Sequence, residues 1–102
     1  MASRLSLHAK LEELRGLGKV HFQPPQSKKI SYPCIVYDRS PASLRSANDH
    51  GYIYTEHYTV THISREPNDP VVKEIALAFP MIRPTSKFEN DNLHHDVFDL
   101  YY

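Results

Sequence analysis

The chain has 102 residues, and twelve lysines and arginines balance twelve aspartates and glutamates to give a formal net charge of zero. This length allows one domain, residues 1–102, and the neutral charge removes the broad basic surface expected of a nonspecific nucleic-acid binder. A single cysteine, Cys34, excludes an internal disulfide, and no apolar run is long enough to predict a membrane span. We therefore expect a soluble protein that is made and assembled inside a cell.

A first helix is predicted over residues 3–16. Leu7, Leu11 and Leu14 recur at spacings of four and three, which places them on one stripe of a helix. Gly16 follows the stripe, and glycine readily adopts the left-handed conformation that ends helices. The segment is expected to pack this leucine stripe against a core.

Extended structure is predicted for most of the middle of the chain. A short strand spans Val20–Phe22, and a second strand, over 30–38, is rich in β-branched and aromatic residues. Residues 39–51 are polar and lack periodicity, so they are predicted to form a long loop. A long strand follows over 52–64, with mixed polar and apolar residues on both faces.

The last third of the chain begins with a second helix. Asp69 followed by Pro70 is a strong start signal, because the carboxylate caps free N–H groups and proline fits the first turn. A strand is predicted over 81–87 and a turn over 89–92. The terminal segment 92–102 is rich in aromatic residues, and we expect it to be paired in a sheet because unpaired chain ends fray.

The predicted order is helix, short strand, strand, long strand, helix, strand, strand. Runs of strands interrupted by helices indicate an α+β fold. We expect one small domain with a mostly antiparallel or mixed sheet of about four to five strands, and with both helices packed on one face.

Tyrosine is the most suggestive residue type, with seven copies. Tyr52, Tyr54 and Tyr58 share one face of the long predicted strand, and Tyr101 and Tyr102 lie at the end of the terminal one. Tyrosine combines a large apolar body with a polar tip and is enriched at protein interfaces. The sequence leaves two roles undecided for these residues, namely ordinary packing in the sheet and contact with a partner.

Histidine is also abundant, and His94-His95-Asp96 is the densest polar cluster. On a strand, the first and third of these residues point to one face and the second to the other, so no more than two could bind one ion. The spacings typical of zinc sites do not occur. Cys34, in an apolar strand, is expected to be an inert core thiol. We predict no catalytic residue, no metal ligand and no cofactor.

Four stretches together resemble the tail-terminator (tail-completion) proteins of long-tailed bacteriophages. The resemblance is carried by Val20-His21-Phe22-Gln23-Pro24-Pro25, Tyr32-Pro33-Cys34-Ile35-Val36-Tyr37, Tyr58-Thr59-Val60-Thr61 and 91–102. It implies an α+β subunit of a hexameric ring on the head-proximal end of the tail tube. Such a ring stops tube polymerisation and presents a surface to the head-completion (stopper) protein, while DNA passes through its lumen.

This resemblance implies no enzymatic activity, a location in the virion neck and tail, and assembly in the host cytoplasm. The partners it implies are other copies of the chain, the tail tube protein and the stopper protein, with genomic DNA nearby and no membrane. A ring requires a head-to-tail contact between two different patches. Our candidates for that interface are Tyr54, Tyr58, Leu93, Phe98, Leu100, Tyr101 and Tyr102. For contact with the tube or the stopper, our candidates in the predicted loop are Arg39, Leu44, Arg45 and Asn48.

Three other functions stay open. The chain could be the stopper protein of the same neck, which is also small and ring-forming. It could be a small nucleic-acid-binding regulator, although it lacks a basic recognition helix. A metal hydrolase built on the histidines is the third alternative, and stoichiometric bound zinc would support it.

Overall fold

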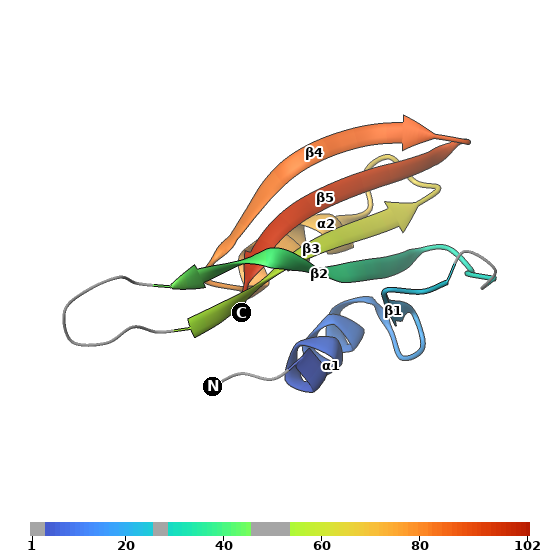
Figure 1. The fold of residues 1–102 in the computed structure, drawn as a ribbon. Helices are drawn as coiled ribbons and strands as arrows, with labels where there is room; N and C mark the ends of the chain where they lie inside the picture. Colours follow the sequence, from blue (N-terminus) through green and yellow to red (C-terminus); the bar gives the residue numbers. More distant parts are fainter. Residues whose placement is uncertain (1–3, 26–28, 46–53) are drawn as a thin grey trace.

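A single mixed sheet flanked by helices makes up the computed structural model, which describes residues 4–25, 29–45 and 54–102. Within these residues the sheet has five strands in the order β1-β2-β3-β5-β4 (Figure 1). β1 is parallel to β2, and the other neighbouring pairs are antiparallel. This arrangement confirms the predicted α+β fold. The elements are α1 (Arg4–Arg15), β1 (Val20–Phe22), β2 (Cys34–Arg45), β3 (Tyr54–Ser64), α2 (Pro70–Ala78), β4 (Ile82–Asn90) and β5 (Leu93–Tyr101).

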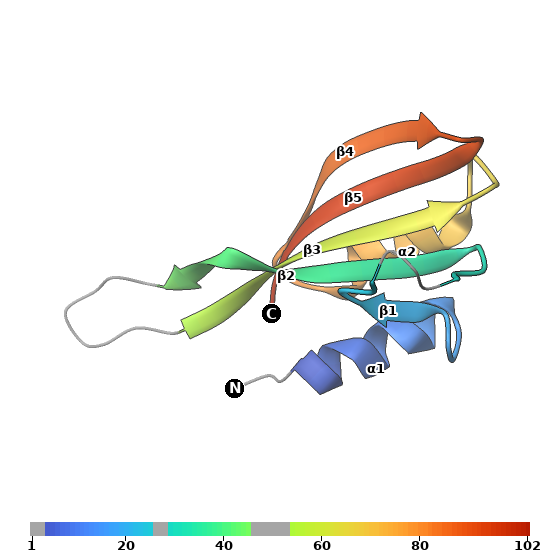
Figure 2. The ribbon, with the colours of Figure 1, turned by 45° about the vertical axis from the view of Figure 1, so that its right-hand side comes forward.

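Both helices pack on the same face of the sheet, as predicted (Figures 1 and 2). α1 lies beneath the β1–β2 edge, and α2 lies behind β3 and β5. Alternate residues of the central strands point toward the helices. The core between helices and sheet consists of Leu7, Leu11, Val20, Ile35, Tyr37, Tyr58, Val60, Val71, Ile75, Phe79, Phe98 and Leu100.

The predicted end signals of the helices are confirmed. α1 ends at Arg15, and Gly16 takes a φ of 132° in the left-handed region where a side chain would be strained. The side chain of Asp69 accepts a hydrogen bond of 3.0 Å from the N–H of Val71, and Pro70 occupies the first position of α2. A carboxylate satisfies an otherwise unpaired helix donor there.

The β4–β5 hairpin turns on two residues. Asp91 and Asn92 both have positive φ values, 52° and 63°. Two left-handed residues form the turn whose twist best matches antiparallel strands, and Asp and Asn tolerate that conformation. The turn lies within the predicted segment 89–92, and β4 extends three residues beyond its predicted end at Lys87.

The prediction of a loop from residue 39 onward was wrong for its first part. β2 continues to Arg45, because Ser43, Leu44 and Arg45 pair with Glu56, Thr55 and Tyr54 after an irregularity that begins at Arg39. Pairing with β3 thus overrides the polar composition of the segment. The paired ends of β2 and β3 form an arm that projects beyond the other strands (Figure 1). The remainder of the predicted loop lies outside the described residues.

The terminal strand is an interior strand of the sheet. β5 lies between β3 and β4 and is paired with both, which confirms that this segment is packed. The N–H of Tyr102 donates to the carbonyl oxygen of Glu56 at 3.0 Å. In the described part of the chain, neither helix is long and apolar enough to cross a membrane.

Candidate functional site

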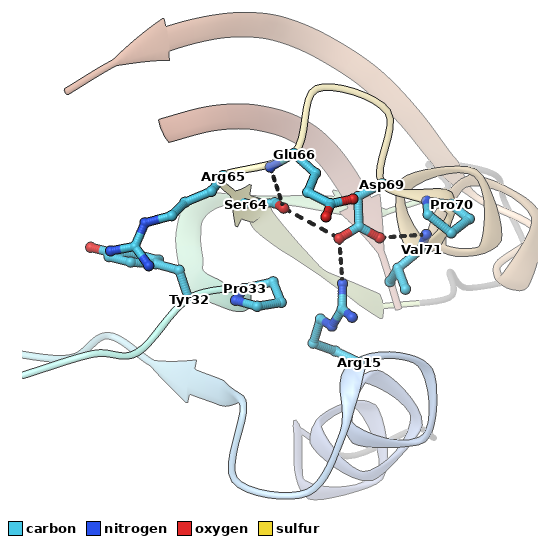
Figure 3. Close-up of a pocket in the computed structure, with 9 residues that line it drawn as sticks. All are labelled: Arg15, Tyr32, Pro33, Ser64, Arg65, Glu66, Asp69, Pro70 and Val71. Atoms are coloured by element: carbon cyan, nitrogen blue, oxygen red, sulfur yellow. Dashed lines mark hydrogen bonds and ion pairs between the residues drawn. The ribbon is translucent and has the colours of Figure 1, made fainter. Parts of the chain in front are cut away.

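A buried polar cluster joins α1, β3 and the start of α2. Nη1 of Arg15, at the end of α1, lies 2.9 Å from Oδ2 of Asp69, just before α2 (Figure 3). Both side chains are largely buried. Ser64, the last residue of β3, donates to the same carboxylate oxygen at 3.3 Å and accepts from the N–H of Glu66 at 3.0 Å. We call Arg15, His62, Ser64 and Asp69 the polar clamp.

His62 is the most buried member of the polar clamp, with no exposed surface. Nη1 of Arg15 lies 3.0 Å from its Nε2. Arginine can only donate, so Nε2 accepts and the ring proton is on Nδ1. This Nδ1 makes no hydrogen bond within the described part of the chain. Burial lowers the pKa of His62 below its ordinary value, and the neighbouring Asp69 only partly offsets this effect.

The ionisation of Asp69 is fixed by its partners. Burial alone would raise its pKa, but the hydrogen bond from the Val71 N–H and the bond and charge of Arg15 outweigh that effect, so the pKa lies below its usual value. The carboxylate is therefore charged at neutral pH and pairs with Arg15. An ion pair held in this way is costly to break, because removing one partner leaves an uncompensated, largely buried charge.

A cavity of about 390 Å³ opens beside the polar clamp (Figure 3). Ser64 and Asp69 line it, but they do not form a catalytic triad. In a triad, histidine lies between the serine and the carboxylate and accepts the serine proton. Here Ser64 donates directly to Asp69, and His62 accepts from Arg15. The arrangement ties the ends of three elements together, and we assign it a structural role.

Three of the predicted interface residues belong instead to the core of the same chain. Tyr58 and Phe98 are each 2% exposed and Leu100 is fully buried. They face α1 and α2 from the middle of the sheet, and Phe98 also lines a cavity of about 430 Å³ between α2 and β4. These three side chains thus serve packing within the monomer, and their predicted role in an interface stays a prediction.

The other predicted interface residues have different environments. Tyr101 is half-buried on the face away from the helices and stacks on His57, with ring centroids 4.6 Å apart. Tyr102 is half-buried against Phe79, and its hydroxyl lies 2.8 Å from Oγ of Ser6. Leu93 is half-buried at the start of β5, and Tyr54 begins β3 in the projecting arm.

Those predicted partner-contact residues that the structure describes belong to the arm. Arg39 lies 3.6 Å from the carboxylate of Glu56 and 5.8 Å from the ring centre of Tyr58. Leu44 and Arg45 are part of β2 near the end of the arm. Asn48 lies outside the described residues.

Among the described residues, no three histidine, cysteine, aspartate or glutamate side chains gather as metal ligands. His94 lies 3.7 Å from Glu89, while His95 stacks on Phe88 with nearly parallel rings. Cys34 is fully buried, and burial raises the pKa of its thiol to about 11. The thiol is thus protonated at neutral pH and unsuited to nucleophilic attack.

The feature that sequence reasoning missed is the open β4 side of the sheet. Eight consecutive residues of β4, Arg83–Asn90, are exposed, and its outer edge has no strand partner among the described residues. A trough of about 430 Å³ separates β4 from α2 and is lined mainly by apolar surface, including Val72, Ala76 and Phe98. The signal available in the sequence was Pro84, which indicates an irregularity in this strand.

Comparison with models of known protein families finds no match for this chain. Comparison with curated protein sequences also finds none.

Proposed function

We propose that this chain is a structural subunit of a bacteriophage neck, a tail terminator that assembles into a ring on the head-proximal end of the tail tube. The ring stops tube polymerisation, joins the tail to the head-completion (stopper) protein and lets DNA pass through its lumen. The sequence resemblance supplies this specific role. The edge strand β4, exposed over Arg83–Asn90, is the structural observation that supports it best.

An exposed edge strand is a liability for a protein that works alone. Its unpaired N–H and C=O groups can bind another chain, and monomeric proteins usually shorten or cover such edges. β4 is nine residues long and has no cover on its outer edge within the described part of the chain. Pro84 and the bulge between Pro84 and Ser86 interrupt the edge, which favours specific docking over indefinite strand addition.

The opposite side of the molecule presents a different surface. There α1 lies beneath the short strand β1, so the two edges of the sheet are unlike each other (Figure 2). A head-to-tail contact joins two unlike patches and closes into a ring when the rotation permits. The arm of β2 and β3 extends from this body and is a second candidate surface for the tube or the stopper.

The direct experiment mixes the purified chain with tail tube protein from the same phage and measures tube length by electron microscopy. We expect a ring-shaped density at one end of each tube and an arrest of elongation. Tubes that grow to the same length with and without the chain would contradict the proposal. Binding to the portal and adaptor instead of the tube would assign the chain to the stopper position.

A further inference from the structure

The α2–β4 trough is an open groove of about 430 Å³. Val72 and Ala76 form its α2 wall, and Pro84 and Thr85 form its β4 wall. A second cavity of about 320 Å³ continues it toward the start of α2 and adds Lys73 to the lining. The trough is therefore mainly apolar, and the end where α2 begins is lined by Lys73 and by Asp69, whose carboxylate is paired with Arg15.

Lys73 is the cation in the trough that has no ion-pair partner in the part of the chain that the structure describes. Lys87 also lines both cavities, but its Nζ lies 3.0 Å from Oδ1 of Asp96 and is thus already paired. Lys73 is exposed and makes no ion pair with any described residue. A ligand for the trough would therefore combine apolar groups with one acidic group.

The chain carries a surface of that description on α1. Leu5, Ala9 and Glu13 are exposed at spacings of four on the side of α1 opposite its buried leucines, and Leu17 lies in the turn just beyond the end of α1. Leu5 is 69% exposed and Leu17 88%. We call these four residues the outer stripe. Glu13 has no ion pair among the described residues.

α1, which carries the outer stripe, lies at the β1 edge of the sheet, whereas β4, which forms one wall of the trough, is the opposite edge strand (Figure 1). The outer stripe and the trough therefore cannot meet within one molecule, but they can meet between neighbouring copies arranged head to tail. We propose that the outer stripe of one copy docks into the α2–β4 trough of the next, with Glu13 paired to Lys73. The occupant of the trough is thus a second copy of this chain. This inference rests on the proposed ring and names the surfaces that form it.

Two physical effects support this pairing. A helix that lays apolar side chains into a groove is a common mode of protein recognition, and Leu5 on α1, together with Leu17 just beyond its end, would supply the anchors. The opposite charges of Glu13 and Lys73 would fix the register of the helix in the trough, because electrostatic complementarity mainly sets specificity.

Charge reversal tests the pair directly. Glu13→Lys and Lys73→Glu should each weaken self-association, with about a tenfold rise in the apparent dissociation constant measured by sedimentation at low salt. The double variant, which restores opposite charges, should recover most of the loss. Glu74→Lys and Lys29→Glu are matched controls on exposed positions outside the trough, and both should self-associate as the natural chain does.

A second pair of variants tests the apolar part. Leu17→Asp should abolish assembly, whereas Leu77→Asp, at an equally exposed leucine of α2 that does not line the trough, should leave it unchanged. Circular dichroism confirms folding of every variant. If rings form normally in Leu17→Asp and in both charge-reversal variants, the docking is overturned while the ring proposal stands. If the charge rescue succeeds but tubes are not capped, the docking stands and the terminator role fails.

Discussion

The two sides of this sheet differ in how completely the rest of the chain covers their strands. On the β1–β3 side, α1 and α2 cover the strands, and the polar clamp ties three elements through a charged pair at 2.9 Å. On the β4 side, eight consecutive residues are exposed and a trough separates the strand from α2. The difference shows that the strands of the first side are covered within the monomer, and we propose that another molecule covers the second side.

The largest difference in stability loss is expected between substitutions of two phenylalanines that lie on the two strands of one hairpin. Phe98 is 2% exposed beneath the helices, and Phe88 is 48% exposed on β4. Phe98→Ala should lower the free energy of unfolding by about 3–5 kcal/mol, because it leaves a cavity in the core. Phe88→Ala should cost less than about 1 kcal/mol. Urea denaturation of both variants measures the difference, and similar losses would mean that β4 is packed as tightly as the core.

An intermediate contrast is expected between two arginines that each pair with an aspartate. Arg15→Ala should destabilise the fold by about 2–3 kcal/mol, because it leaves the largely buried Asp69 without its charge partner. Arg83→Ala removes a partner of Asp99 on the open side, where Arg83 is 76% exposed, and should cost no more than about 0.5 kcal/mol. Thermal denaturation measures the stability of both variants, and an equal loss in the two would contradict the distinction between the two sides of the sheet.

The smallest expected effect is a pH dependence of folding stability, which arises from His62 on the β1–β3 side. Burial holds the pKa of His62 below 6.5 in the folded state, so below that pH the unfolded chain takes up a proton that the folded chain does not. The stability contributed by neutral His62 is therefore complete above pH 6.5 and is lost as the pH falls. Between pH 7 and 5.5 we expect a loss of about 1 kcal/mol.

Unfolding of the His62→Gln variant isolates this effect from the other histidines. Its stability should fall less steeply with decreasing pH than that of the natural chain. Parallel pH profiles for the two chains would show that His62 takes up its proton equally well in the folded and unfolded states. Asp69 contributes in the same direction only in more acidic solution, since its pKa lies below 3.8.

The local signals in the sequence were sufficient for much of the fold. The leucine stripe, the Asp69-Pro70 start and the turn before the terminal strand each depend on neighbouring residues, and all three are confirmed. The extension of β2 to Arg45 was missed, because its polar residues are held in a strand by pairing with β3. Local composition does not encode such pairing.

The candidate site was harder to predict for two physical reasons. Buried aromatic residues serve cores and interfaces alike, so the sequence could not show that Tyr58 and Phe98 are used within the monomer. The polar clamp joins Arg15 to Asp69 across 54 positions, and the trough exists only because β4 and α2 are held apart in space. Features of this kind follow from the arrangement of elements and have no local pattern.

The central claim is that the open side is completed by another copy of the chain. The most direct measurement is the absolute mass in solution, by light scattering at several high concentrations. The account predicts a species of about 71 kDa, the mass of six 11.8 kDa chains in a closed ring. A mass of 11.8 kDa at every concentration would contradict it.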